Sequence, residues 1–196
     1  MGLICIQPGW TPIDLADAKQ HLRVDSNADD TLIEAYINGA ASHIEQTRSL
    51  SLTTAIYELR LDAFPKTGVI RLPIVPTVSV SDISYYDADG NLQSLDDSLY
   101  IVGNLGNDHS MTVITAAVGT MFPQTQTRIE SVVVTFMAGY ATDEYGAAEI
   151  PPDLRAAILL YVGSLYENRE AQGDRTITEL PMGFEQLISV RGITRV

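Results

Sequence analysis

The chain has 196 residues, 45% of them hydrophobic, which is enough to bury a sizeable core in one domain or in one domain with an inserted module. Asp and Glu number 25 against 12 Lys and Arg, and the formal net charge of -13 argues against specific or tight binding to a phosphate backbone. The single cysteine, Cys5, excludes an internal disulfide framework, and because no apolar run approaches the ~18 residues of a membrane span, we expect neither export nor membrane insertion.

Residues 1–50 are predicted to supply the N-terminal helices of a helical core. Thr11 is the expected N-cap of the first helix, and Asp14 is expected to reach back to it as in a capping box. Turn-forming and acidic residues at 25–30 then separate this helix from a second one. The apolar positions recur at three-and-four spacing, at Leu15, Ala18 and Leu22 in the first helix and at Leu32, Ile33, Tyr36, Ile37, Ala40, Ala41 and Ile44 in the second.

Residues 51–140 change to the two-residue period of β-strands. Tyr57, Leu59 and Leu61 alternate with charged residues, which predicts a half-buried strand over 57–62. Further strands are predicted at 69–72, 78–86, 99–102, 111–114 and 131–137. The segment 86–91 predicts a hairpin turn in which Gly90 adopts a positive φ. Together these segments indicate a small antiparallel β module.

Residues 141–196 contain a long helix and a C-terminal tail. Pro151 or Pro152 suits the first helical turn, and Gly173 suits the end of the helix. One apolar stripe comprises Leu154, Ala157, Ile158, Tyr161, Val162 and Leu165, and we expect it to pack against the two N-terminal helices. Three large side chains fall outside that stripe, which indicates contact with another subunit: Leu159, Leu160 and Tyr166. The order of elements predicts an α+β fold in which a helical bundle is interrupted by an inserted β module.

We identify no catalytic, metal-binding or cofactor-binding residues in the sequence. His21, His43 and His109 lack a second ligand-type residue at the spacing of a metal site. Asp108-His109-Ser110 contains the residue types of a catalytic triad, but adjacent backbone positions cannot supply its geometry. The segment 87–91 is interpreted as a turn and not as a calcium loop, since its glycine is two positions too early.

Several blocks, in their order and spacing, resemble the head-tail connector (adaptor) proteins of tailed phages and prophages. They are residues 15–25 with 29–33, the hairpin at 85–90, residues 160–170, and the closing segment 179–184 with Arg191. The resemblance implies a non-enzymatic protein, without cofactors, that forms a homo-oligomeric ring beneath the portal of a DNA-filled head and extends the DNA channel. Its partners would be the portal protein and a head-completion, stopper or tail protein.

The resemblance also implies where such contacts lie. Ring contacts are expected at the three off-stripe residues of the long helix, and a portal-facing role is expected for the tail 180–196. The tail candidates are Phe184, Leu187, Ile188, Arg191 and Arg195. The protein would reside in the virion, and in the host cytoplasm before assembly. Two alternatives stay open: another virion component, such as a stopper or tail-completion protein, and a small-ligand-binding or hydrolytic protein that uses carboxylates and His109 of the β module.

Overall fold

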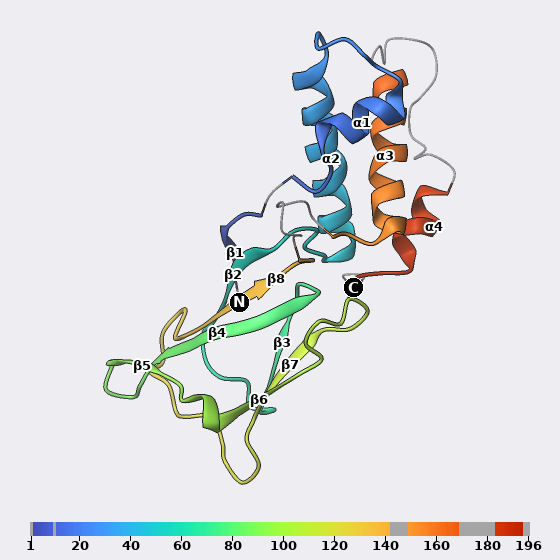
Figure 1. Cartoon of the computed structure of the whole chain (residues 1–196). Helices are drawn as coiled ribbons and strands as arrows, with labels where there is room; N and C mark the ends of the chain where they lie inside the picture. The colour runs from blue at the N-terminus through green and yellow to red at the C-terminus, as the bar shows by residue number, and fades with distance from the viewer. Residues whose placement is uncertain (1, 10, 142–148, 169–182, 194–196) are drawn as a thin grey trace. The chain divides into compact units, whose positions relative to one another are not determined.

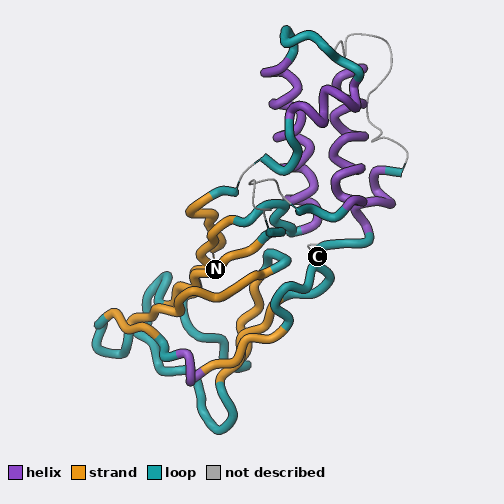
Figure 2. The backbone as a smooth tube through the Cα atoms, viewed as in Figure 1, coloured by secondary structure: helices purple, strands orange, loops and turns teal. Residues whose placement is uncertain are grey.

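The computed structural model describes residues 2–9, 11–141, 149–168 and 183–193, and the chain divides into two compact units (Figure 1). Residues 1–9 and 54–139 form what we call the β unit, and residues 10–53 and 140–196 form the helical unit. The described residues contain four α-helices and two antiparallel sheets (Figure 2), so the predicted α+β class is confirmed.

The β unit is built from one five-stranded and one three-stranded sheet. The larger sheet has the strand order β1-β2-β8-β4-β5 and the smaller one β3-β7-β6. The strands are β1 (Gly2–Gln7), β2 (Ala55–Leu61), β3 (Val69–Leu72), β4 (Thr77–Tyr86), β5 (Leu92–Ser94), β6 (Tyr100–Gly103), β7 (Thr112–Ala116) and β8 (Val132–Ala138), with a short 3-10 helix, η1 (Asp97–Leu99), before β6. Every described pairing is antiparallel.

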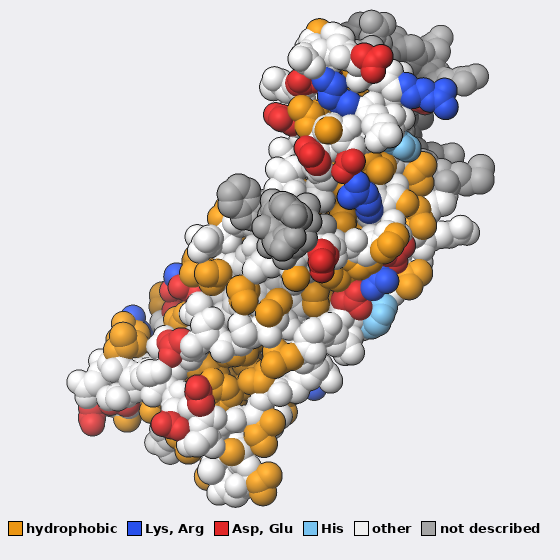
Figure 3. All heavy atoms as spheres, in the orientation of Figure 1, with side chains coloured by type: hydrophobic (Ala, Val, Ile, Leu, Met, Phe, Trp, Pro, Cys, Tyr) orange, Lys and Arg blue, Asp and Glu red, His pale blue; other side chains and the backbone are white. Residues whose placement is uncertain are grey.

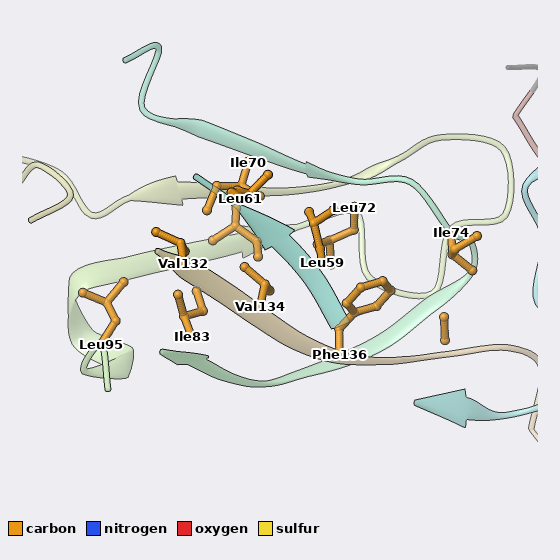
Figure 4. Packing of buried hydrophobic residues seen from close by; sticks show 12 residues of the cluster. Leu59, Leu61, Ile70, Leu72, Ile74, Ile83, Leu95, Val132, Val134 and Phe136 are labelled. Carbon is orange, nitrogen blue, oxygen red and sulfur yellow. The ribbon is translucent and has the colours of Figure 1, made fainter. Parts of the chain in front are cut away.

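Both sheets contribute side chains to one hydrophobic core. Figure 4 shows Ile70 and Leu72 of the smaller sheet beside Leu61 and Leu59 of the larger one. The alternation predicted for the strand at 57–62 explains this packing, because Leu59 and Leu61 are buried while Glu58 and Arg60, which alternate with them, are not. Phe136 on β8 is fully buried and its ring stacks on Tyr57 at a centroid distance of 5.6 Å.

Six strands of the β unit lie within two residues of the predicted ranges, but β1 and β5 were not predicted. The predicted range 1–50 placed the first nine residues with the helices. In the structure, these residues group with the β unit. Leu3 pairs with Leu59, a partner more than 50 residues away. Pairing at that separation leaves no local periodic pattern in so short a segment.

The predicted hairpin turn joins β4 to β5. Gly90 has φ 87°, as expected. The Asp87 carboxylate accepts hydrogen bonds from the backbone N–H groups of Asp89, at 3.0 Å, and Asn91, at 2.9 Å. These bonds, the one from Asn91 above all, lower the pKa of Asp87, as expected for an ionised turn residue.

The helical unit contains α1 (Leu15–Leu22), α2 (Asp30–Arg48), α3 (Pro152–Glu167) and α4 (Phe184–Ser189). The predicted stripes supply the buried positions: Ala18 in α1; Ile33, Ile37, Ala40, Ala41 and Ile44 in α2; and Leu154, Ala157, Ile158 and Val162 in α3. Helix α3 begins at Pro152 and ends at Glu167, with Asn168 as its C-cap. Gly173, the predicted end, lies outside the described residues.

The predicted N-cap of α1 is wrong by three residues. Asp14, and not Thr11, occupies the cap position, and its carboxylate accepts a hydrogen bond from the N–H of Ala16 at 3.5 Å. An extended residue whose side chain bonds two positions ahead is a common helix start, and a carboxylate there also interacts favourably with the helix dipole. Pro12 and Ile13, which precede the cap, are buried.

Candidate interaction surface of the helical unit

Of the three off-stripe residues of α3, one is clearly accessible. Leu160 is 37% exposed, whereas Leu159 and Tyr166 are half-buried. The Tyr166 hydroxyl donates a hydrogen bond to the Asp29 carboxylate at 2.6 Å. Tyr166 therefore links the C-terminal end of α3 to the start of α2, a role that its off-stripe position did not reveal.

Leu160 lies in a shallow groove of about 300 Å³ on the helical unit. The other lining residues are His21, Gly163, Ser164 and Glu167. The four α3 residues follow the pattern i, i+3, i+4 and i+7 and therefore share one helix face. A Cβ added to Gly163 would lie 3.6 Å from His21 Nε2, so the glycine keeps the floor of the groove open between α3 and α1. This spacing was a signal in the sequence that we did not use.

Two of the tail candidates are covered by their own chain. Phe184 and Ile188 of α4 are fully buried. The ring of Phe184 packs against Tyr161 of α3, at a centroid distance of 5.2 Å, and against His43 of α2, at 5.9 Å. These side chains serve the core of the helical unit in this structure. Leu187 is half-buried, and Arg195 lies outside the described residues.

Helix α4 is also tied to the unit by polar contacts. Arg191 Nε donates to the Asp153 carboxylate of α3 at 2.7 Å. Arg48, the last residue of α2, donates from Nε to the carbonyl of Arg191 at 2.8 Å and from Nη2 to that of Ser189 at 2.9 Å. The N–H of Ile193 donates to the Arg48 carbonyl at 2.6 Å. Carbonyls at and just after the C-terminal ends of α2 and α4 thus obtain the partners that a helix end requires.

Two further ion pairs join the helices. Lys19 of α1 lies 2.6 Å from the carboxylate of Asp30, which begins α2. Arg155 of α3 pairs with Asp17 of α1. Each pair joins residues from different helices, so sequence spacing could not predict which charges would meet.

The carboxylates and histidine of the β unit do not assemble a recognisable reaction centre. His109 Nε2 lies 3.1 Å from Asp108 Oδ1, and the backbone N–H groups of His109 and Ser110 both donate to the Asn107 side chain, as in a turn. Asp96 caps η1, where its carboxylate accepts a hydrogen bond from the backbone N–H of Ser98 at 2.9 Å. In the described part of the chain, no cluster of three or more His, Cys, Asp or Glu side chains could hold a metal ion.

The surroundings of Tyr100 in the β unit make its hydroxyl less acidic. Burial, with a contribution from the hydrogen bond to Asp97, raises the pKa of Tyr100 to about 12. Its hydroxyl therefore stays neutral at physiological pH.

Among the helices of the described ranges, none is both long and apolar enough to cross a membrane.

Comparison with known families gives a match over part of the chain. Residues 12–87 match the family model described as "Phage gp6-like head-tail connector protein", which confirms the resemblance inferred from the sequence. The matched segment runs from just before α1 to the end of β4 and the first residue of the hairpin turn. Comparison with curated proteins finds no match.

Three solved structures share the fold over the full length of this chain. They are described as "Neck of empty GTA particle computed with C6 symmetry", with a TM-score of 0.79, "Virion of native gene transfer agent (GTA) particle", with 0.77, and "Neck of native GTA particle computed with C12 symmetry", with 0.77. In each, 24% of aligned residues are identical, and the alignment covers 100% of this chain and 97% of the other. The whole chain, both units included, therefore has the fold of those proteins.

Proposed function

We propose that this chain, whose residues 12–87 match a family of phage head-tail connector proteins, is a structural connector in the neck of a tailed-phage or phage-like particle. It would form a ring beneath the portal and extend the DNA channel towards the tail, without catalytic turnover. The observation that carries this proposal is the fold shared over the full chain with proteins of particle necks and virions. We interpret its architecture as a helical bundle interrupted by the inserted β module.

The charge of the chain supports a channel-forming role. At a formal charge of -13, it repels the phosphate backbone, so DNA could slide past without being gripped. On the face shown in Figure 3, Lys and Arg side chains (blue) are scattered singly and form no continuous stripe along either unit. A weakly interacting surface of this kind suits a conduit and not a sequence-reading protein.

Contacts between ring neighbours would use the groove around Leu160. An exposed leucine beside an open glycine position offers apolar surface with room for a side chain of another copy. Leu159 would lie at the margin of this contact. Tyr166 would support it by holding the end of α3 against the start of α2 through its hydrogen bond to Asp29. The tail from residue 180 to 196 would face the portal, with Leu187 as the described apolar candidate.

Size measurement with the cognate portal tests the proposal directly. Light scattering on the chain alone and on the chain mixed with portal should show a portal-dependent assembly. A monomer alone is compatible with the proposal, since a partner can drive the association. A chain that stays monomeric and ignores the portal would exclude the function. Electron microscopy of particles distinguishes a connector against the portal from a stopper or tail-completion protein farther from it.

Replacement of Leu160 tests the groove. Leu160→Asp introduces a charge on an exposed position, so we expect an intact fold but at least ~10-fold weaker portal-dependent assembly, by the loss of more than about 1.4 kcal/mol at each repeated contact. Ala35→Asp, at an exposed position of α2, is the matched control and should assemble normally. If Leu160→Asp unfolds instead, Leu160 contributes to the core of the helical unit and not to a contact between copies.

A further inference from the structure

The two outer strands of the five-stranded sheet are β1 and β5. An outer strand carries one row of backbone N–H and C=O groups that its own sheet does not use, and this row can pair with a strand of another chain. Proteins commonly block such edges with charged residues. Neither outer strand contains one: β1 reads Gly-Leu-Ile-Cys-Ile-Gln and β5 reads Leu-Gln-Ser.

The outer strands also expose large apolar side chains on the same face of the sheet. Leu3 packs against the hydrophobic core, so its neighbour Ile4 points to the opposite face, where it is 41% exposed. On β5, Gln93 lies opposite the core-packed Tyr85, so Leu92 points away from the core and is 64% exposed. Both edges of one sheet therefore present an aliphatic side chain on the face that points away from the core.

The directions of the strands decide how two copies could meet. All four pairings across the sheet are antiparallel, so the first and fifth strands of the order, β1 and β5, run in the same direction. Suppose that the sheet of a second copy extends the first, with the core faces on the same side and the strands running in the same directions. Then β5 of one copy lies beside β1 of the next, and the two form a parallel pair. This contact joins two different surfaces and repeats around an axis, as a ring requires, whereas pairing of β1 with another β1 would stop at two copies.

The smaller sheet is a weaker candidate for the same role. Its outer strands, β3 and β6, also run in the same direction, because both pair antiparallel with β7. However, β3 carries the exposed Arg71 in the middle of only four residues, and a charge in that position opposes edge pairing.

We propose that, in the ring, β5 of each copy pairs in parallel with β1 of its neighbour, and that Leu92 lies beside Ile4 across the contact. The inference rests on the ring of the proposed function. Ile4 is the partner because regular pairing in β1 ends at Cys5, where the register shifts, and because Gly2 offers no side chain. With only three residues in β5, each contact is weak, so the continuous sheet forms where many copies are held together.

Cysteine cross-linking of the full chain tests this contact. Ile4→Cys and Leu92→Cys are combined in a chain whose native thiol is removed by Cys5→Ser, and rings assembled with portal are mildly oxidised. Neighbouring strands lie about 4.8 Å apart, within the range that a disulfide spans. The matched control combines Ile4→Cys with Gln93→Cys, whose side chain lies on the opposite face. Non-reducing electrophoresis should show a ladder of covalent multimers, at least ~10-fold stronger for the first pair than for the control.

Each outcome has a separate meaning when ring formation is first checked by electron microscopy. Rings with the ladder confined to the Ile4 and Leu92 pair support the proposal. Rings without that ladder, or with equal ladders for both pairs, overturn the strand contact and leave the connector function intact. Failure of the parent chain to form any ring with the portal overturns both.

Discussion

At the scale of single residues, Tyr166 shows how a side chain outside an apolar stripe can serve its own fold. Its hydroxyl donates to Asp29 at 2.6 Å, across 137 positions of sequence. We expect Tyr166→Phe to lose about 1 kcal/mol of unfolding free energy, the usual net value of a partly exposed hydrogen bond. Thermal denaturation should show a melting temperature lower by roughly 2–4 °C.

A double-mutant cycle assigns that loss to the contact. Asp29→Ala alone, Tyr166→Phe alone and both together should give a coupling energy of at least about 0.5 kcal/mol. Purely additive losses would mean that the hydroxyl acts on stability by another route.

Glu45 makes stability depend on pH. Burial raises the pKa of its carboxyl above the ordinary value of 4.5, despite the opposing hydrogen bond from the N–H of Leu52 at 2.8 Å. The folded chain therefore keeps this proton where the unfolded chain has lost it, so its contribution to stability falls as the pH rises from 4.5 through the folded pKa. We expect Glu45→Gln, whose amide oxygen can still accept the N–H, to melt a few degrees higher than the parent at pH ~7.

The difference should vanish below pH ~4, where both states of the parent are protonated. Glu34→Gln, at an exposed position of the same helix, is the control for loss of one negative charge. An equal gain in that variant would assign the effect to net charge and not to the burial of Glu45.

At the scale of elements, α4 is a six-residue helix that depends on its contacts with α2 and α3. We expect Arg191→Ala, which removes the pair with Asp153, to speed amide hydrogen exchange across Phe184–Ser189 by at least ~5-fold, equivalent to about 1 kcal/mol of local stability. Arg155→Ala is the control. Its pair with Asp17 is more exposed than the Arg191–Asp153 pair, and it joins α3 to α1 and not to α4. Equal exchange in the parent and in Arg191→Ala would show that the pair with Asp153 does not hold the helix in place.

Elements with a local periodic pattern could be predicted, and those formed by distant pairing could not. Helix α2 repeats its buried residues at helical spacing, and β2 alternates, so both follow from the order of their own residues. Strand β5 has three exposed residues and no pattern, and it forms because the Asp87 turn returns the chain along β4. The cap of α1 was misplaced because Thr11 and Asp14 are both suitable residues and only the backbone conformation chooses between them.

At the scale of the whole molecule, the acidic charge predicts how the chain behaves towards DNA. We expect fluorescence anisotropy with a labelled duplex to show no binding tighter than ~10⁻⁴ M at physiological salt, the weak end of non-specific association. A duplex mixed with an unrelated basic protein serves as the positive control. Micromolar binding that weakens steeply with salt would contradict the proposal that DNA slides past this chain without being gripped.

The order of residues alone was enough for the α+β class, six of the eight strands that the structure describes, the buried stripes of the helices and the resemblance to connector proteins, because each depends on local periodicity or on motif order. Folding was needed to place Phe184 and Ile188 in a core, to join Tyr166 to Asp29 and to put Gly2–Gln7 at the edge of a sheet. These features depend on residues far apart in the chain, and an apolar side chain has the same pattern in sequence whether its own core or another subunit covers it.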